Sequence, residues 1–257
     1  MDDIEVAKSI IKKSGNRFHC KAINYFSEKG WSAQISPYYL DNSTGKAREI
    51  DLVVEKLWIY DDPIKKRYET INIKLFVECK YIPHANVFWF DSKDFSSARD
   101  WVITNTPHTL GNEYVEKHHF MESNKVAKLF STENKKDLEY EVIYKALNQS
   151  LNAMVNLRNM GTIIPDHEYK GRDHVCTIEI PVILCNSFDK FYGLDIHDPA
   201  EVELIRDNFQ LEVNYAYIDN QKSNRNEYFL IDIVSFDTID AYLNTLQEDI
   251  EGIKMIF

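Results

Sequence analysis

The sequence lacks long apolar runs and is poor in glycine and proline. It has 8 glycines and 7 prolines in 257 residues, a composition that disfavours a disordered chain. No segment approaches the roughly 20 apolar residues of a membrane-spanning helix, and no charged stretch followed by an apolar one opens the chain. We therefore expect a globular, cytoplasmic protein without a membrane partner.

Cysteine is also scarce, and the chain lacks several common motifs of cofactor and catalytic sites. Cys20, Cys79, Cys176 and Cys185 show no CxxC spacing, so we expect buried thiols in a reducing compartment rather than a zinc site or a disulfide framework. The sequence contains no GxGxxG, Walker, GxSxG or HExxH motif. The sequence therefore gives no support for dinucleotide binding, for a P-loop nucleotide site, for a serine hydrolase or for a zinc protease.

Acidic residues exceed basic ones, which gives a net charge of −11. The excess is uneven, because residues 186–257 hold 5 Lys and Arg against 15 Asp and Glu, whereas residues 1–185 hold 25 and 26. Contacts to phosphate supply most non-specific affinity for nucleic acid, so this balance disfavours tight unaided DNA binding. The acidic C-terminal part is a candidate surface for a protein partner or a second copy of the chain.

One segment, residues 71–80, combines a strand-forming pattern with charges at its end. Its β-branched and aromatic residues predict a strand that is covered on both faces. Glu78 and Lys80 lie two residues apart and therefore share a face, with Cys79 on the other. Burying these charges is costly unless they pair with each other or bind a metal ion. The end of this strand is therefore a candidate site.

A second β-rich run, residues 48–54, carries a lone acid. Apolar residues at alternate positions leave Asp51 on the opposite face. If this run forms a hairpin with residues 71–80, Asp51 comes alongside Glu78 and Lys80. Two carboxylates suit Mg²⁺, which takes few protein oxygens and completes its shell with water and substrate phosphate. A lysine beside the ion can orient or deprotonate an attacking water.

Asp51 followed by a strand that ends in Glu78-Cys79-Lys80 resembles the motif of the PD-(D/E)xK nuclease superfamily, in its restriction-endonuclease-like branch. The resemblance covers roughly residues 5–185. It implies an α/β fold with a restriction-endonuclease-like αβββαβ core, whose mixed central sheet is flanked by helices.

The implied organisation has two parts. Residues 1–185 would form the nuclease-like core, with an insertion at about residues 91–138, where the sequence has weak periodicity. Residues 186–257 would form an acidic C-terminal extension packed on the core sheet, with a β-hairpin and a terminal helix.

The resemblance also implies a function, that of a Mg²⁺-dependent endodeoxyribonuclease in restriction or phage defence. Asp51, Glu78 and the backbone carbonyl of Cys79 would hold Mg²⁺, for which Mn²⁺ can substitute, and Lys80 would position or help deprotonate the attacking water. DNA is the expected substrate by resemblance alone. A ribonuclease or single-strand nuclease on the same core stays open, as does a catalytically silent fold that acts as a nucleic-acid-binding or protein-assembly module.

Two helix positions complete the comparison. Members of this branch often carry a glutamine on the helix after the Glu-x-Lys strand and a tyrosine four residues on. The predicted helix 139–158 offers Gln149 as a catalytic residue, but Ala153 stands in place of the tyrosine, and Gln149 is equally well explained as an ordinary polar residue. On the predicted helix 17–29, His19 stands where the family often has a metal-binding glutamate. We expect His19 to be a surface or hydrogen-bonded histidine rather than a metal ligand.

Overall fold

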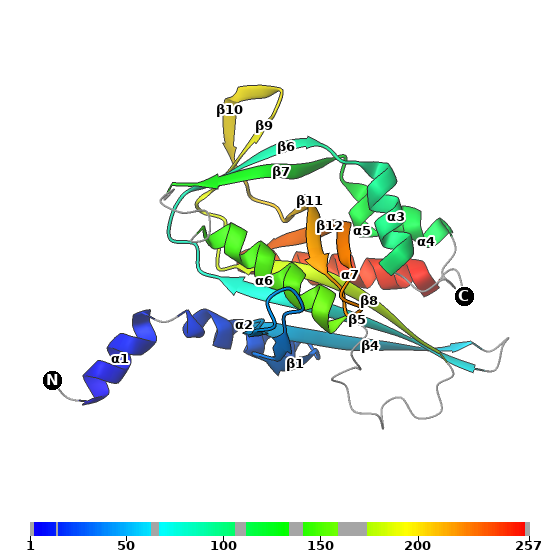
Figure 1. Cartoon of the computed structure of the whole chain (residues 1–257), viewed down its shortest axis with the longest axis horizontal. Coiled ribbons are helices and arrows are strands. Elements are labelled where there is room, and N and C mark those ends of the chain that lie inside the picture. Colours follow the sequence, from blue (N-terminus) through cyan, green and yellow to red (C-terminus); the bar gives the residue numbers. More distant parts are fainter. Residues whose placement is uncertain are drawn as a thin grey trace.

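The computed structural model describes residues 3–13, 15–62, 67–105, 112–133, 141–158 and 174–254. A large mixed sheet runs through the molecule, and helices cover both of its faces (Figure 1). The protein therefore has a mixed α/β fold, as the sequence predicts.

The described helices and strands follow one another along the chain without a separation into an all-helical and an all-strand part. The helices are α1 (Asp3–Lys13), α2 (Asn16–Glu28), α3 (Phe95–Asn105), α4 (Asn112–Lys117), α5 (His119–Glu122), α6 (Val142–Leu157) and α7 (Ile239–Lys254), with a 3-10 turn η3 (Phe236–Thr238) before α7. The strands are β1 (Ser32–Ile35), β2 (Tyr38–Leu40), β3 (Ala47–Glu49), β4 (Leu52–Asp62), β5 (Arg67–Lys80), β6 (Asn86–Ser92), β7 (Lys125–Thr132), β8 (His174–Cys185), β9 (Phe191–Asp195), β10 (Asp198–Leu204), β11 (Phe209–Ile218) and β12 (Asn224–Ser235).

The main sheet has ten described strands in the order β1-β4-β5-β8-β12-β11-β7-β6-β9-β10. In its centre, β5 pairs antiparallel with β4 and parallel with β8, and β8 pairs parallel with β12. The short strands β2 and β3 form a separate antiparallel pair. Strand β5, which carries the candidate site, is thus an interior strand with neighbours on both sides.

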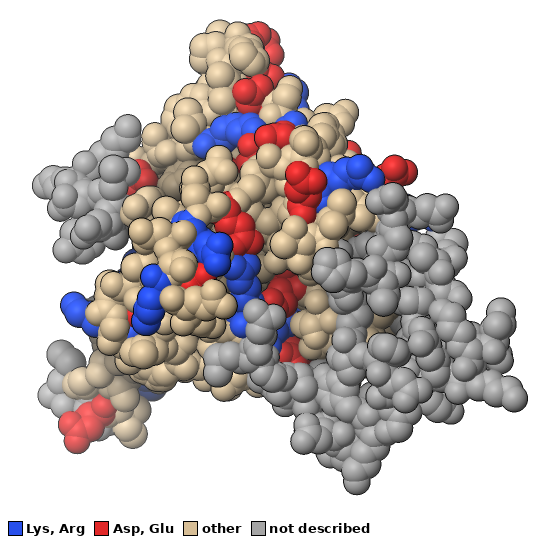
Figure 2. Space-filling view, turned by 45° about the vertical axis from the view of Figure 1, so that its right-hand side comes forward, with Lys and Arg blue, Asp and Glu red and all other residues tan. Residues whose placement is uncertain are grey.

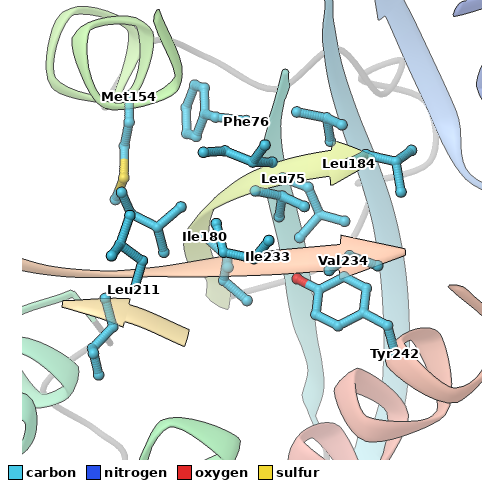
Figure 3. Packing of buried hydrophobic residues seen from close by; sticks show 14 of the residues in the cluster. Leu75, Phe76, Met154, Ile180, Leu184, Leu211, Ile233, Val234 and Tyr242 are labelled. Atoms are coloured by element: carbon cyan, nitrogen blue, oxygen red, sulfur yellow. The ribbon is translucent and has the colours of Figure 1, made fainter. Parts of the chain in front are cut away.

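The interior of β5 is covered on both faces, as its continuous apolar pattern predicts. Every residue from 70 to 79 is buried. Helix α6 covers one face: Met154 projects from the helix toward the sheet (Figure 3), and the Ser150 hydroxyl donates to the Phe76 carbonyl at 3.0 Å. On the other face of the sheet, α2 packs against β5 and α7 packs against β12, with Tyr242 beside Val234 (Figure 3). Each buried aliphatic or aromatic side chain contributes about 1.5–3 kcal/mol to this packing.

The helices and the C-terminal hairpin expected from periodicity are present. Helices α2, α6 and α7 occupy the predicted segments, and β11 and β12 form the predicted antiparallel hairpin. The prediction of one continuous strand over residues 48–54 was wrong, because β3 ends at Glu49 and β4 begins at Leu52. The intervening residues pair instead with the segment before β2: the Ser36 N–H donates to the Asp51 carbonyl at 2.9 Å.

Residues 91–138, expected to be an insertion, hold α3, α4, α5 and β7. Strand β7 lies inside the main sheet, between β11 and β6. Strands from the predicted core and from residues 186–257 are neighbours in the same sheet, since β12 pairs with β8. The division of the chain at residue 185 stays a prediction.

The described cysteines divide by position. Cys79 and Cys185 are buried, as expected, and Cys20 is exposed. Cys20 lies on the outer side of α2, whose inner stripe is formed by Phe18, Ala22 and Phe26. The side chain of Cys176 lies outside the described residues.

Candidate functional site

Asp51 and Glu78 lie opposite each other at one end of the β4–β5 hairpin. The antiparallel register pairs Leu52 with Val77, so Asp51, the residue before β4, lies next to Glu78 of β5. The backbone N–H of Asp51 donates to Oε2 of Glu78 at 3.4 Å. The hairpin on which the predicted site depends is therefore present, and it brings the two acids together.

Lys80 ends β5 and pairs with Glu78. Its Nζ donates to Oε1 of Glu78 and, at 3.3 Å, to Oε1 of Gln149 on α6. The Glu78 side chain is fully buried, and this burial raises its pKa to about 7, with attraction to Lys80 opposing the shift and the charge of Asp51 adding to it. The carboxyl group of Glu78 can therefore exchange a proton near neutral pH.

The carboxylate of Asp51 points toward α2 and not only toward Glu78. Its Oδ2 lies 2.9 Å from Nε2 of His19 and accepts a hydrogen bond of 2.9 Å from the backbone N–H of Cys79. Burial alone would raise the pKa of Asp51, but the His19 hydrogen bond and the charge of Lys80 bring it below its ordinary value. Asp51 is therefore held as a carboxylate, ready to accept a cation.

His19 belongs to this site by contact and by charge. The hydrogen bond to Asp51 raises its pKa, and Glu78 and Lys80 also act on it electrostatically. The expectation of a hydrogen-bonded histidine is met, and its partner is the acid that begins the motif. The available sequence signal was its position, next to Phe18 on the buried stripe of α2, where the family often has a metal-binding glutamate.

Cys79 offers a second kind of donor that the sequence analysis did not assign. The resemblance implied its backbone carbonyl as a ligand, whereas its thiol Sγ, a ring nitrogen of His19 and a carboxylate oxygen of Asp51 all lie within 4.8 Å of one another. Such a group can hold a metal ion. Because side chains alternate along β5, the thiol lies on the α2 side while Glu78 and Lys80 face α6.

Gln149 meets the site through Lys80. Ser150, the next residue on α6, donates a hydrogen bond from its hydroxyl to the Phe76 carbonyl of β5. This bond holds α6 against β5 beside Gln149. Ala153, at the position where the resemblance led us to look for a tyrosine, is fully buried on the same helix. The structure therefore brings Asp51, Glu78, Lys80 and Gln149 together, while their catalytic roles stay predictions.

A different buried cluster lies between α5, α7 and β12. Each ring nitrogen of His119 contacts a carboxylate, Nδ1 that of Asp249 and Nε2 that of Asp232 at 3.0 Å. Burial would lower the pKa of His119, but the two carboxylates outweigh it and raise the pKa to about 10. Tyr242 donates to Asp232 as well, and a cavity of about 450 Å³ adjoins these groups. Since the ring already bridges two acids, we assign this cluster to holding α5 and α7 against the sheet.

Comparison with family models, with curated proteins and with solved structures finds no match to this chain. Among the described residues, no helix combines the length and the apolar character needed to cross a bilayer. The functional assignment therefore depends on the geometry of the strand-end site.

Proposed function

We propose that this protein is a metal-dependent nuclease of the PD-(D/E)xK type, with a restriction-endonuclease-like αβββαβ core. The observation that supports it most is the contact between Asp51, the residue before β4, and Glu78 of β5, with Lys80 ending β5. Three ionisable groups meet at the edge of an apolar core, where charges are costly unless they do chemistry or neutralise one another.

The residues fit a divalent cation on chemical grounds. Glu78 is buried, and Lys80 is its ammonium partner among the described residues. Burial raises the pKa of Glu78 to about 7, so a cation beside this carboxylate would favour its charged form. Asp51, Glu78 and the backbone carbonyl of Cys79 would hold Mg²⁺ or Mn²⁺ through hard oxygen donors. The bound ion would activate water and stabilise charge on the phosphate.

Lys80 has two roles in this proposal. In the structure its ammonium compensates Glu78, and Glu78 would exchange this partner for the cation. Lys80 would then be free to orient the attacking water or to help remove its proton. Gln149, which contacts the Lys80 ammonium from α6, would keep it directed toward the strand end.

DNA is the proposed substrate, and charge limits how it is bound. Figure 2 shows Lys and Arg side chains interspersed with Asp and Glu on one face of the molecule. Because phosphate contacts supply most non-specific affinity, we infer that a protein partner or a second copy helps to bring DNA to the site. Strand β10, exposed along its whole length at the outer edge of the sheet and part of the acidic segment, is the proposed contact. A role in restriction or phage defence is consistent with this assembly.

Cleavage assays test the proposal directly. Purified protein is incubated with supercoiled plasmid, single-stranded DNA and RNA, each with Mg²⁺, Mn²⁺ or EDTA. We expect metal-dependent cleavage of duplex DNA that EDTA abolishes, and a loss of about 10²- to 10⁴-fold in Lys80→Ala. Cleavage of RNA or single strands alone would revise the substrate and keep the chemistry.

Lys128 provides a matched control. It is another partly buried lysine, it pairs with Glu212, and it lies on β7 outside the site. Lys128→Ala should cleave like the wild type. If folded wild-type protein cleaves none of the three substrates with either ion, the catalytically silent binding or assembly module is favoured instead.

A further inference from the structure

The donor atoms on the α2 side of the site are not those that Mg²⁺ prefers. A ring nitrogen of His19, a carboxylate oxygen of Asp51 and Sγ of Cys79 lie within 4.8 Å of one another. They come from three separate elements: α2, the residue before β4, and β5. Mg²⁺ binds hard oxygen ligands in an octahedron, whereas imidazole and thiolate favour Zn²⁺ and other borderline or soft cations.

The geometry suits a catalytic type of site with an open position. Three protein ligands of the nitrogen, oxygen and sulfur types, plus a water, are a common catalytic zinc arrangement. A tetrahedral ion would draw such donors to about 3.5 Å from one another, so small side-chain rotations suffice. Cys79 is buried, whereas the side chains of His19 and Asp51 are 24% and 16% exposed. One side of the group is thus closed by protein and the other is accessible to water or a phosphate oxygen.

We propose that His19, Asp51 and the Cys79 thiolate form a mixed-donor site for a Zn²⁺-class cation. This reverses the expectation from cysteine spacing, since a single cysteine joins the site through the fold and not through a CxxC motif. On binding, the Cys79 thiol releases its proton to solvent. The His19 ring, which now donates from Nε2 to Asp51, releases the proton of the nitrogen that binds the ion to solvent or carries it on its other ring nitrogen. The inference goes beyond the proposed function: this site shares Asp51 with the Mg²⁺ ligand set but takes its other donors, His19 and the Cys79 thiolate, from the α2 side of β5. Ion binding at this site does not require the protein to cleave DNA.

Cobalt absorption spectroscopy tests the thiolate ligand. The full-length protein, stripped of metal by a chelator, is titrated with Co²⁺ alone, and then with Zn²⁺ as a competitor. We expect a thiolate-to-cobalt charge-transfer band with one equivalent of Co²⁺, displaced by Zn²⁺. Cys79→Ser should abolish the band, and Cys185→Ser and Cys20→Ser should keep it, because they remove a buried and an exposed thiol that are not part of the group.

A second variant, His19→Gln, tests the site even if Cys79→Ser fails to fold. His19 is partly exposed, so His19→Gln should fold as judged by circular dichroism, keep the band at saturation, and bind Co²⁺ at least about tenfold more weakly. Cobalt binding without the band, a band that persists in Cys79→Ser, or an unchanged affinity in His19→Gln would overturn the inference.

The two proposals fail separately in these experiments. A cobalt band that depends on Cys79, without cleavage of any nucleic acid, supports the metal site and contradicts the nuclease. Cleavage that depends on Lys80 with Mg²⁺, in a protein whose Co²⁺ complex lacks the band, supports the nuclease and overturns the Zn²⁺-class site.

Discussion

Nε2 of His19 lies 2.9 Å from Oδ2 of Asp51, so helix α2 and the β4–β5 hairpin meet at the acid that begins the motif. The contact fixes the direction of the Asp51 carboxylate, since the same oxygen also accepts the Cys79 N–H. The Asp51 carboxylate, at the start of β4, therefore links helix α2 to the end of β5.

Replacing this histidine tests whether the contact matters for activity. His19→Gln should reduce metal-dependent cleavage by about 10- to 100-fold, because the Asp51 carboxylate loses the partner that orients it. The measurement is the initial rate of plasmid nicking as a function of Mn²⁺ concentration. His197→Gln is the control, since His197 also pairs with an aspartate, Asp91, but on the exposed surface. Equal rates for the two variants would remove His19 from the site.

The protonation of Glu78 should control metal affinity near neutral pH. Its folded-state pKa of about 7 lies above the ordinary value of 4.5 because of burial, so the protonated form dominates below pH 7 and competes with the cation. Mn²⁺ affinity should therefore rise from pH 6 to pH 8, with release of a proton seen by calorimetry in two buffers. Glu78→Gln should bind weakly and show no such rise. A wild-type affinity independent of pH over this range would contradict the proposal.

The same shift has a consequence for stability. For an acid whose folded-state pKa is raised, ionisation in the folded state costs stability, so the free energy of unfolding should fall as pH rises from about 4.5 to 7 and stay lower above. Saturating Mn²⁺ should restore stability most at the higher pH, where Glu78 is charged. Urea unfolding with and without Mn²⁺ at pH 5.5 and 8 measures both effects.

Gln149 is expected to act through Lys80. Gln149→Ala should lower the cleavage rate by about tenfold, a smaller effect than that of Lys80→Ala, because the ammonium stays but is less well directed. Asn148→Ala is the neighbouring control, since among the described residues the Asn148 side chain donates to the Tyr144 carbonyl of its own helix and not to the site. A single-turnover assay should place the loss in the chemical step. If the two variants behave alike, Gln149 is an ordinary polar residue of α6.

The His119 cluster should dominate stability and leave metal binding unchanged. His119→Gln breaks a buried charge bridge between Asp232 and Asp249 and should cost about 3–5 kcal/mol of unfolding free energy. In the wild type this contribution is complete below about pH 6.5 and is lost as pH rises toward the folded pKa of about 10. Urea unfolding at pH 6.5 and 9 compares the variant with His197→Gln, which should stay within about 0.5 kcal/mol of the wild type.

Local patterns were sufficient to predict the elements that carry the site. The β-branched run before Glu78 and Lys80 predicts a buried strand, and the stripe of α2 and the periodicity of α6 predict helices, because each pattern depends only on which residues recur at what spacing. The break before β4 could not be predicted in this way. It depends on residues 36–37 pairing with Ile50 and Asp51, a contact that no local period records.

The sequence by itself determined the strand end, with Glu78 and Lys80 on one face and Cys79 on the other, since side-chain direction in a strand follows from chain order. Only the tertiary structure decided what meets there. The β4–β5 register sets Asp51 opposite Glu78, and the packing of α2 against the sheet brings His19 and the thiol to the same carboxylate. Such contacts depend on how separate elements pack over a shared apolar core. The spacing of residues along the chain does not specify that packing.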